Sequence, residues 1–197
     1  MFSIAVFASG SGTNARRLFE YFQNHPLISV QLVVSDRKAA GVHEHAEAFG
    51  IESHYFQKAI FSENPQVVLN KLWEKKIDYI LLAGFLLLVP ETIISAFDGR
   101  ILNIHPALLP KFGGAGMYGQ RVHEAVLESG EMETGMTIHE VNSEFDSGKM
   151  VFQARCPVFP SDSVSDIAAR VLQLEHEHYS FVAEQFIQTS NRKKTKK

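Results

Sequence analysis

Short apolar runs alternate with amphipathic helical segments through the first half of this chain. The run at residues 2–8 ends at Ser-Gly-Ser-Gly, and residues 14–25 then place apolar side chains at helical spacing before Pro26. The same alternation predicts strands at residues 28–34, 52–56, 79–83 and 100–105, and helices at residues 40–49, 65–76 and 90–97. Such an order forms a parallel sheet with helices on both faces, and its ligands bind beyond the carboxyl ends of the strands. We therefore expect a site among the loops at residues 9–14, 84–89 and 105–119.

The second half of the chain predicts a different arrangement. Residues 135–141 and 150–159 have strand character and flank Asp-Ser-Gly at 146–148, and from Ser163 a long helix carries an apolar stripe. We therefore expect an α/β fold, with a Rossmann-like, mostly parallel twisted sheet, helices on both faces, antiparallel strands in the C-terminal half and a long C-terminal helix. Because no repeat or shift in composition divides the chain, residues 1–190 are predicted to form a single domain, followed by a basic C-terminal tail at residues 191–197.

The charges of the chain are unevenly distributed. Its 197 residues carry a formal net charge of −3, but five of the 19 Lys and Arg lie in the last six positions, so that residues 1–190 carry −8. An acidic body argues against nucleic acid as a partner. The apolar run at residues 79–89 is about half a membrane span, and the one cysteine, Cys156, cannot form an internal disulfide. These features predict a cytoplasmic protein with no membrane partner.

A glycine-rich loop joins the first strand to the first helix, and it consists of Gly10, Ser11, Gly12, Thr13 and Asn14. Its glycines allow successive N–H groups to point at one anion, and the start of the helix adds a partial positive charge. The glycine spacing differs from GxGxxG and the P-loop lysine is absent, which disfavours a dinucleotide or a nucleoside triphosphate as ligand. The pattern supports a phosphate site and a simple turn with Thr13 as helix cap about equally.

Asn103 and His105 are the polar side chains of an apolar stretch at residues 101–109. In a strand they lie on one face near its carboxyl end, because successive side chains alternate. An amide beside an imidazole offers an oxyanion donor and a proton-transfer group. If the fold brings Asp146 close, its carboxylate would orient the imidazole and favour the protonated form. The alternatives are a hydrogen-bonded buried pair and an ordinary turn at Asp146.

Three further segments contain residues that could bind a metal or form a mobile loop. Residues 43–45 and 175–178 are rich in His and Glu, but they lack the spacing of HExxH and have no CxxC partner, so no metal site is predicted. The glycines at residues 113–116 predict a mobile loop at residues 111–119, which suits a lid.

Taken together, these segments resemble the phosphoribosylglycinamide formyltransferase family, which comprises folate-dependent enzymes of purine synthesis. The resemblance covers nearly the whole chain, and the stretch at residues 103–110 is typical of folate formyltransferases. The early glycine loop narrows the choice to the members with a phosphorylated substrate. The residues that carry the resemblance are Ser-Gly-Ser-Gly-Thr-Asn at 9–14, Ala-Gly-Phe at 83–85, Asn-Ile-His-Pro-Ala-Leu-Leu-Pro at 103–110, Asp-Ser-Gly at 146–148 and Gln-Leu-Glu-His at 173–176.

The resemblance implies that the amine of glycinamide ribonucleotide attacks the formyl group of 10-formyltetrahydrofolate, a co-substrate, through a tetrahedral intermediate and without a metal. Asn103 would donate to the oxyanion, His105 would be the proton donor, and Asp146 would raise the pKa of His105. These small-molecule substrates would be the partners of a monomer or homodimer. The substrate phosphate and ribose would contact Gly10, Ser11, Gly12, Thr13, Asn14, Leu172, Gln173, Leu174 and Glu175. The folate would contact Phe85, Leu86, Leu87, Leu88, Val89, Asn103, Val141, Asn142, Ser143, Glu144, Phe145 and Asp146.

Three segments depart from the family pattern. Residues 86–89 read Leu-Leu-Leu-Val where Met-Arg-Ile-Leu is common, and Asn64 stands where a basic residue is common. The loop at residues 113–119 differs from the usual Pro-Gly-Leu-His type. Because the first two changes remove positive charge near the folate, its glutamate tail is expected to find Lys111 or another donor.

Other users of the same chemistry are the nearest alternatives. Methionyl-tRNA formyltransferase normally carries a C-terminal RNA-binding domain, and formyltetrahydrofolate hydrolase carries an N-terminal regulatory domain, and neither extension is expected in this chain. A non-catalytic nucleotide-binding domain is the alternative from another class. In that case the approach of Asn103, His105 and Asp146 to one another would be a coincidence.

Overall fold

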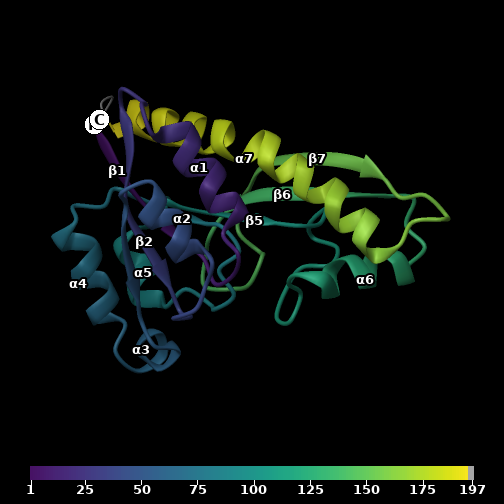
Figure 1. Ribbon diagram of the computed structural model, residues 1–197, viewed down its shortest axis with the longest axis horizontal. Helices are drawn as coiled ribbons and strands as arrows, with labels where there is room; N and C mark the ends of the chain where they lie inside the picture. The colour runs from purple at the N-terminus through teal and green to yellow at the C-terminus, as the bar shows by residue number, and fades with distance from the viewer. Residues whose placement is uncertain (195–197) are drawn as a thin grey trace.

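The structure, a computed structural model, describes residues 1–194, with side chains through residue 189. One seven-stranded sheet runs through it in the order β3-β2-β1-β4-β5-β6-β7 (Figure 1). The first five strands pair in parallel, whereas β6 pairs antiparallel with both β5 and β7. The predicted Rossmann-like sheet is thus confirmed. The strands are β1 (Phe2–Phe7), β2 (Ile28–Ser35), β3 (Glu52–Tyr55), β4 (Tyr79–Leu82), β5 (Ile101–His105), β6 (Glu133–Glu140) and β7 (Met150–Pro157).

Helices cover both faces of the sheet (Figure 1). In β1, Ile4 and Val6 pack with helices on one face, while Ala5 and Phe7 pack with helices on the other, because successive strand residues alternate. The first face carries α1 (Thr13–Phe22), α2 (Val42–Ala48) and α7 (Val164–Lys194), and α6 (Gln120–Glu128) contacts α7. The second face carries α3 (Lys58–Glu63), α4 (Gln66–Glu74) and α5 (Glu91–Ala96).

Three features differ from the sequence-based prediction. Helices α3 and α6 form in segments where no helix is predicted. Helix α7 extends to Lys194 and therefore includes the first residues of the predicted tail, since no proline or glycine interrupts residues 188–194. Residues 195–197 of that tail lie outside the described part of the chain. Within residues 1–194, no helix combines the length and apolarity needed to cross a membrane.

The order of the strands changes direction beside β1. The chain runs from β1 outward to β2 and β3 on one side, and then returns to β4 and β5 on the other. Loops that follow neighbouring strands diverge at such a point and open a crevice. Here the backbone N–H of Ser9 donates to the Gly84 carbonyl at 3.0 Å, and the Ser9 hydroxyl accepts from the Leu86 N–H at 3.0 Å. These bonds hold the loops after β1 and β4 together at the base of the crevice.

Candidate active site

A cavity of about 910 Å³ opens at the carboxyl ends of β1, β4 and β5. Its volume is typical of small-molecule sites. All three loops expected to carry a site contribute to its wall, together with the start of α6 and part of α7. Most of the predicted binding residues line it, but Ser143, Gln173 and Leu174 do not. On α7 only the face with Leu172 and Glu175 points to the cavity, whereas Leu174 packs on the core and Gln173 is exposed. The predicted residues in the wall are Gly10, Ser11, Gly12, Thr13, Asn14, Phe85, Leu86, Leu87, Leu88, Val89, Val141, Asn142, Glu144, Phe145, Leu172 and Glu175, with Asn103, His105 and Asp146.

The glycine-rich loop leads directly into α1. Gly12 precedes the helix with φ +79°, and no side chain caps the first turn. Thr13 is thus the first helical residue and not the cap. A Cβ on Gly12 would lie 2.7 Å from both Cα and Cβ of Val42, the first residue of α2. The loop is therefore closely backed by α2, and the uncapped N–H groups of α1 offer the donors that an anion needs.

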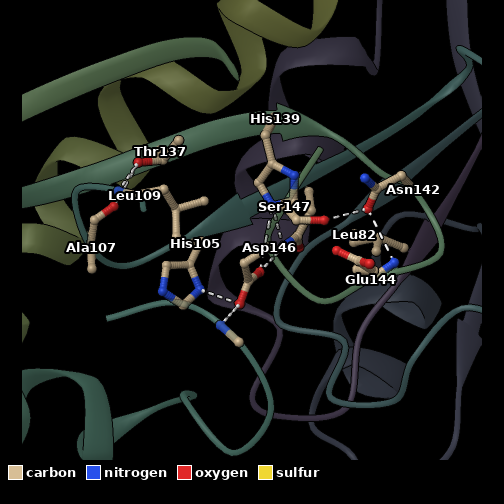
Figure 2. Close-up of polar contacts among 12 residues, drawn as sticks. Leu82, His105, Ala107, Leu109, Thr137, His139, Asn142, Glu144, Asp146 and Ser147 are labelled. Carbon is tan, nitrogen blue, oxygen red and sulfur yellow. Dashed lines mark hydrogen bonds and ion pairs between the residues drawn. The ribbon is translucent and has the colours of Figure 1, made fainter. Parts of the chain in front are cut away.

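Asp146 joins the other two predicted catalytic side chains. Its Oδ2 lies 3.5 Å from Nδ1 of His105 and accepts the Gly114 N–H at 3.0 Å (Figure 2). Its Oδ1 accepts the side-chain amide of Asn103 at 3.3 Å. The backbone of Asp146 has φ +53°, a conformation that Asp adopts more readily than most residues. The tight turn at residues 146–148 therefore presents the carboxylate to the end of β5.

A second histidine, His139 on β6, belongs to the same network. Its Nε2 lies 3.1 Å from Nδ2 of Asn103 and 3.5 Å from Oδ1 of Asp146. Its Nδ1 lies 2.8 Å from the Glu140 carbonyl, so Nδ1 carries a proton and donates. His139 is not among the residues predicted from the sequence. It reaches the site because Asn103 pairs with His139 in the antiparallel register of β5 and β6, and this register cannot be deduced from the spacing of residues.

Thr137 fixes the loop that follows His105. Its hydroxyl donates to the Ala107 carbonyl at 2.7 Å and accepts the Leu109 N–H at 3.0 Å (Figure 2). His105 pairs with Thr137 across β5 and β6, so the strand that presents the imidazole also anchors its loop. The geometry of the loop after the strand is thereby fixed from the neighbouring strand.

Burial and charge act against each other on His105. Only 4% of the residue is exposed, and this burial lowers the pKa of His105. The charge of Asp146 raises the pKa, as predicted, but the net shift is downward. Nε2 of His105 lies 2.8 Å from the Phe112 carbonyl, so both ring nitrogens face acceptors when the ring is protonated. At neutral pH most of the imidazole is therefore uncharged. When the ring is protonated, each of its N–H groups has an acceptor.

Asp146 is held as a carboxylate. Burial raises its pKa, but the contact with His139, the charge of His105 and the Gly114 N–H together outweigh burial and lower the pKa. Asp146 therefore stays ionised at neutral pH and can stabilise a positive charge on His105.

Glu175, which also lines the cavity, meets the glycine-rich loop. Nδ2 of Asn14 donates to Oε2 of Glu175 at 2.7 Å. Burial raises the pKa of Glu175 to about 7, and the Asn14 hydrogen bond offsets only part of the shift. This contact links α1 to α7 across residues that lie far apart in the sequence.

The predicted folate side combines an apolar wall with a hydrogen-bonded turn. Leu86, Leu87 and Leu88 form the wall, and Oδ1 of Asn142 accepts from the Glu144 N–H at 3.2 Å and from the Ser147 hydroxyl at 3.0 Å (Figure 2). Lys111, expected as a donor for a folate tail, does not line the cavity and instead binds Glu131 at 2.7 Å. Apolar walls with a few polar groups suit a flat heterocycle. The described residues contain no group of side chains that could hold a metal ion.

Comparison with known proteins shows which family this chain resembles. The formyl transferase family matches residues 2–183. The chain is 42% identical over 181 residues to the chloroplastic phosphoribosylglycinamide formyltransferase of Arabidopsis thaliana, covering 89% of this chain and 62% of that relative. It is 33% identical over 196 residues to phosphoribosylglycinamide formyltransferase of Bacillus subtilis, covering 98% of both. The crystal structure of glycinamide ribonucleotide transformylase 1 from Symbiobacterium toebii superimposes with a TM-score of 0.88 at 32% identity, covering 96% of this chain and 89% of that chain.

The match includes all the residues of the candidate site. Asn103, His105, Asp146 and Glu175 fall within residues 2–183. The chain spans about 60% of the length of the two plant relatives it matches, at 62% and 59%, and nearly the whole of the Bacillus relative. By its family match and its bacterial relatives, the chain belongs to the formyl transferase family.

Proposed function

We propose that this protein transfers the formyl group of 10-formyltetrahydrofolate to the amine of N1-(5-phospho-β-D-ribosyl)glycinamide, a step of de novo purine biosynthesis. The observation that carries the proposal is the approach of Asn103, His105 and Asp146 in the wall of a cavity that the uncapped start of α1 also lines. A single ligand with a phosphate and a reactive amine would contact both groups. The names of the relatives support the same reaction.

Asn103, His105 and Asp146 take the catalytic roles in this proposal. The substrate amine attacks the formyl carbon, and Asn103 donates a hydrogen bond to the oxyanion that forms. His105 gives a proton to N10 as the bond from the formyl carbon to N10 breaks, and the proton released by the amine restores His105. Asp146 stabilises the imidazolium that donates this proton, because its carboxylate lies beside Nδ1 of His105. No covalent enzyme intermediate is needed.

The two substrates bind on opposite sides of the catalytic residues. Backbone N–H groups of residues 10–14 hold the phosphate, and Glu175 with Leu172 contacts the sugar or glycinamide. The pterin lies against residues 85–89 and 141–146, where apolar side chains meet backbone polar groups.

A formyl-transfer assay tests the proposal. His105→Ala is expected to lower kcat by about 10² to 10⁴, the usual contribution of a general acid or base. His45→Ala is the matched control, since His45 lies on α2 outside the cavity wall, and it should keep wild-type turnover. Turnover by His105→Ala within a few-fold of wild type would contradict the assigned role, and a wild-type protein without transfer activity would contradict the function.

The cellular setting is part of the same proposal. We place the reaction in the cytoplasm, carried out by one formyltransferase domain at residues 1–190 in a monomer or homodimer. The buried free thiol of Cys156, whose pKa is raised by burial, suits a reducing compartment. Size-exclusion chromatography with light scattering would determine the oligomeric state.

A further inference from the structure

Glu175 is a buried carboxyl group on the phosphate side of the cavity. Only 7% of the residue is exposed, and among the described residues its side chain hydrogen-bonds to the neutral amide of Asn14. Among the described residues that line the cavity there is no Lys or Arg. A buried carboxylate without a cation beside it is costly, so this environment favours the protonated acid.

The groups that surround Glu175 do not offset that cost. From α1 it meets Asn14, and from its own helix it meets Tyr179, whose hydroxyl donates to the Leu82 carbonyl at 2.8 Å and whose ionisation would only add negative charge. Among the cavity histidines, the charge of His105 lowers the pKa of His123, and neither of the two shifts the pKa of Glu175. Glu175 therefore titrates near neutral pH, with its pKa raised to about 7.

The hydrogen bonding of Asn14 is a second observation that favours a protonated Glu175. While Nδ2 of Asn14 donates to Glu175, Oδ1 of Asn14 is buried and has no hydrogen-bond partner. A rotation of the amide by 180° exchanges the two atoms, and a protonated Glu175 can then donate its O–H to Oδ1. The same rotation turns Nδ2, a donor, to the place of the unpaired acceptor. A donor beside the start of α1 stabilises an anion there, whereas a buried acceptor does not.

We propose that Glu175, besides contacting the sugar or glycinamide, takes up a proton when a phosphorylated ligand binds at residues 10–14, and that this proton acts on the phosphate through the orientation of Asn14. The inference rests on the proposed function for the placement of the phosphate. A phosphate at the start of α1 brings negative charge toward the Asn14–Glu175 pair. Protonation of Glu175 removes one of the two negative charges that repel each other, and it leaves Nδ2 of Asn14 free to donate to the phosphate.

Calorimetric binding of ribose 5-phosphate to the full chain tests this inference. Between pH 7.0 and 8.5 the charge of the phosphate monoester is nearly constant, because its second pKa is about 6. We expect the wild-type Kd to rise about tenfold over this range as Glu175 loses its proton. At pH 8, titrations in buffers of different ionisation enthalpy should reveal uptake of close to one proton per site. This second measurement needs no variant.

Glu175→Gln separates the proton from the shape of the side chain. Its amide can donate to Oδ1 of Asn14 at any pH, so the Kd of this variant, whatever its value at pH 7, should not change between pH 7.0 and 8.5, and the proton uptake should disappear. Glu177→Gln, an exposed change on the same helix, should keep both. A wild-type affinity that is independent of pH, an unchanged slope in Glu175→Gln, or a folded wild-type protein that does not bind ribose 5-phosphate would each overturn the inference.

The transfer assay distinguishes this inference from the proposed function. Formyl transfer by a wild-type protein that takes up no proton on binding would remove the role of Glu175 alone. Proton uptake through Glu175 in a protein without formyl-transfer activity would remove the proposed reaction and leave the phosphate site intact.

Discussion

At the scale of single residues, Asp146 holds the candidate active site together. One carboxylate oxygen contacts Asn103 and His139, and the other contacts His105 and the Gly114 N–H. Each of these groups faces the cavity, so the position of one acid sets the position of the predicted oxyanion donor and the predicted proton donor together. A change at Asp146 should therefore affect both proton transfer and charge stabilisation.

Asp146→Asn tests the charge with little change of shape. Without the carboxylate, only the Phe112 carbonyl opposes the effect of burial on His105, and its pKa falls further below the usual value. Since His105 must be protonated to act as donor, activity is lost as pH rises through that pKa, and the alkaline limb of the kcat/KM profile should move to lower pH. Turnover near pH 7 should fall by about 10²-fold or more.

The control for this experiment is Glu144→Gln. Glu144 also lines the cavity, but its side chain is exposed, and the hydrogen bond to Asn142 comes from its backbone N–H. Its variant should leave the alkaline limb in place even if folate binding weakens. An alkaline limb that is the same in Asp146→Asn and wild type would remove Asp146 from the mechanism.

Glu175 gives a prediction about stability that is independent of any ligand. Burial raises its pKa from 4.5 to about 7, so at low pH the carboxyl is protonated in both the folded and the unfolded chain. As pH rises, the unfolded chain ionises first, and stability is lost until pH passes the folded value. Glu175→Gln should thus raise the free energy of unfolding at pH 8 by on the order of 3 kcal/mol and leave it nearly unchanged at pH 4. Denaturant unfolding at the two pH values measures this, and an equal effect at both would contradict it.

The sequence predicts some of these residues well and others poorly, for a physical reason. His105 is the last residue of the parallel strand β5, and Gly12 lies between the parallel strand β1 and helix α1. Because the carboxyl ends of parallel strands meet at one edge of the sheet, both residues could be placed there from the sequence. His139 lies on an antiparallel strand, where its neighbour depends on register. Gln173 and Leu174 matched a motif, but their helix exposes a different face to the cavity.

At the scale of elements, the close contact between the glycine-rich loop and α2 makes Gly12 intolerant of a side chain. Gly12→Ala would strain the backbone at φ +79° and place Cβ 2.7 Å from Val42. We expect a loss of about 2–5 kcal/mol in stability from strain and overlap together. Because the start of α1 would also shift, ribose 5-phosphate should bind at least tenfold more weakly, with a smaller change for 10-formyltetrahydrofolate.

Gly10→Ala is the matched control for the loop. A Cβ at Gly10 would meet nothing within 4 Å, and Gly10 is not among the positive-φ residues. Its thermal unfolding midpoint should stay close to that of wild type. If both variants unfold alike, or if Gly12→Ala weakens folate more than ribose 5-phosphate, the phosphate loop has been misplaced.

The elements themselves were predictable where their patterns are long. Helix α7 repeats its apolar stripe over many turns, and at its start Ser163 and Asp166 exchange hydrogen bonds as a capping pair. Helix α3 has six residues, and α6 offers little more than Val122 and Val126 as an apolar pair. Such short patterns do not distinguish a helix from a loop until the neighbouring elements bury them.

At the scale of the whole molecule, α7 connects the two halves of the sheet. It contacts β5, β6 and β7 as well as α1 and α6, and Tyr179 donates to the carbonyls of Leu82, the last residue of β4, and Leu102 in β5. The same helix carries Glu175 to the cavity. Binding at the phosphate loop and packing of the core therefore depend on one element, which extends to Lys194.

Removal of residues 192–197 tests how much of that extension matters. Ile187, which is fully buried, is the last core residue among the described side chains of α7. Truncation after Asn191 should therefore change the free energy of unfolding by less than about 0.5 kcal/mol, although it removes five positive charges and leaves a formal charge of −8. Ile187→Ala, which leaves a cavity in the core, should cost about 2–5 kcal/mol. A kcat/KM unchanged within twofold in the truncated protein would assign the basic residues no part in substrate capture, whereas a marked fall that is lost at high salt would show that their charge attracts the anionic substrates.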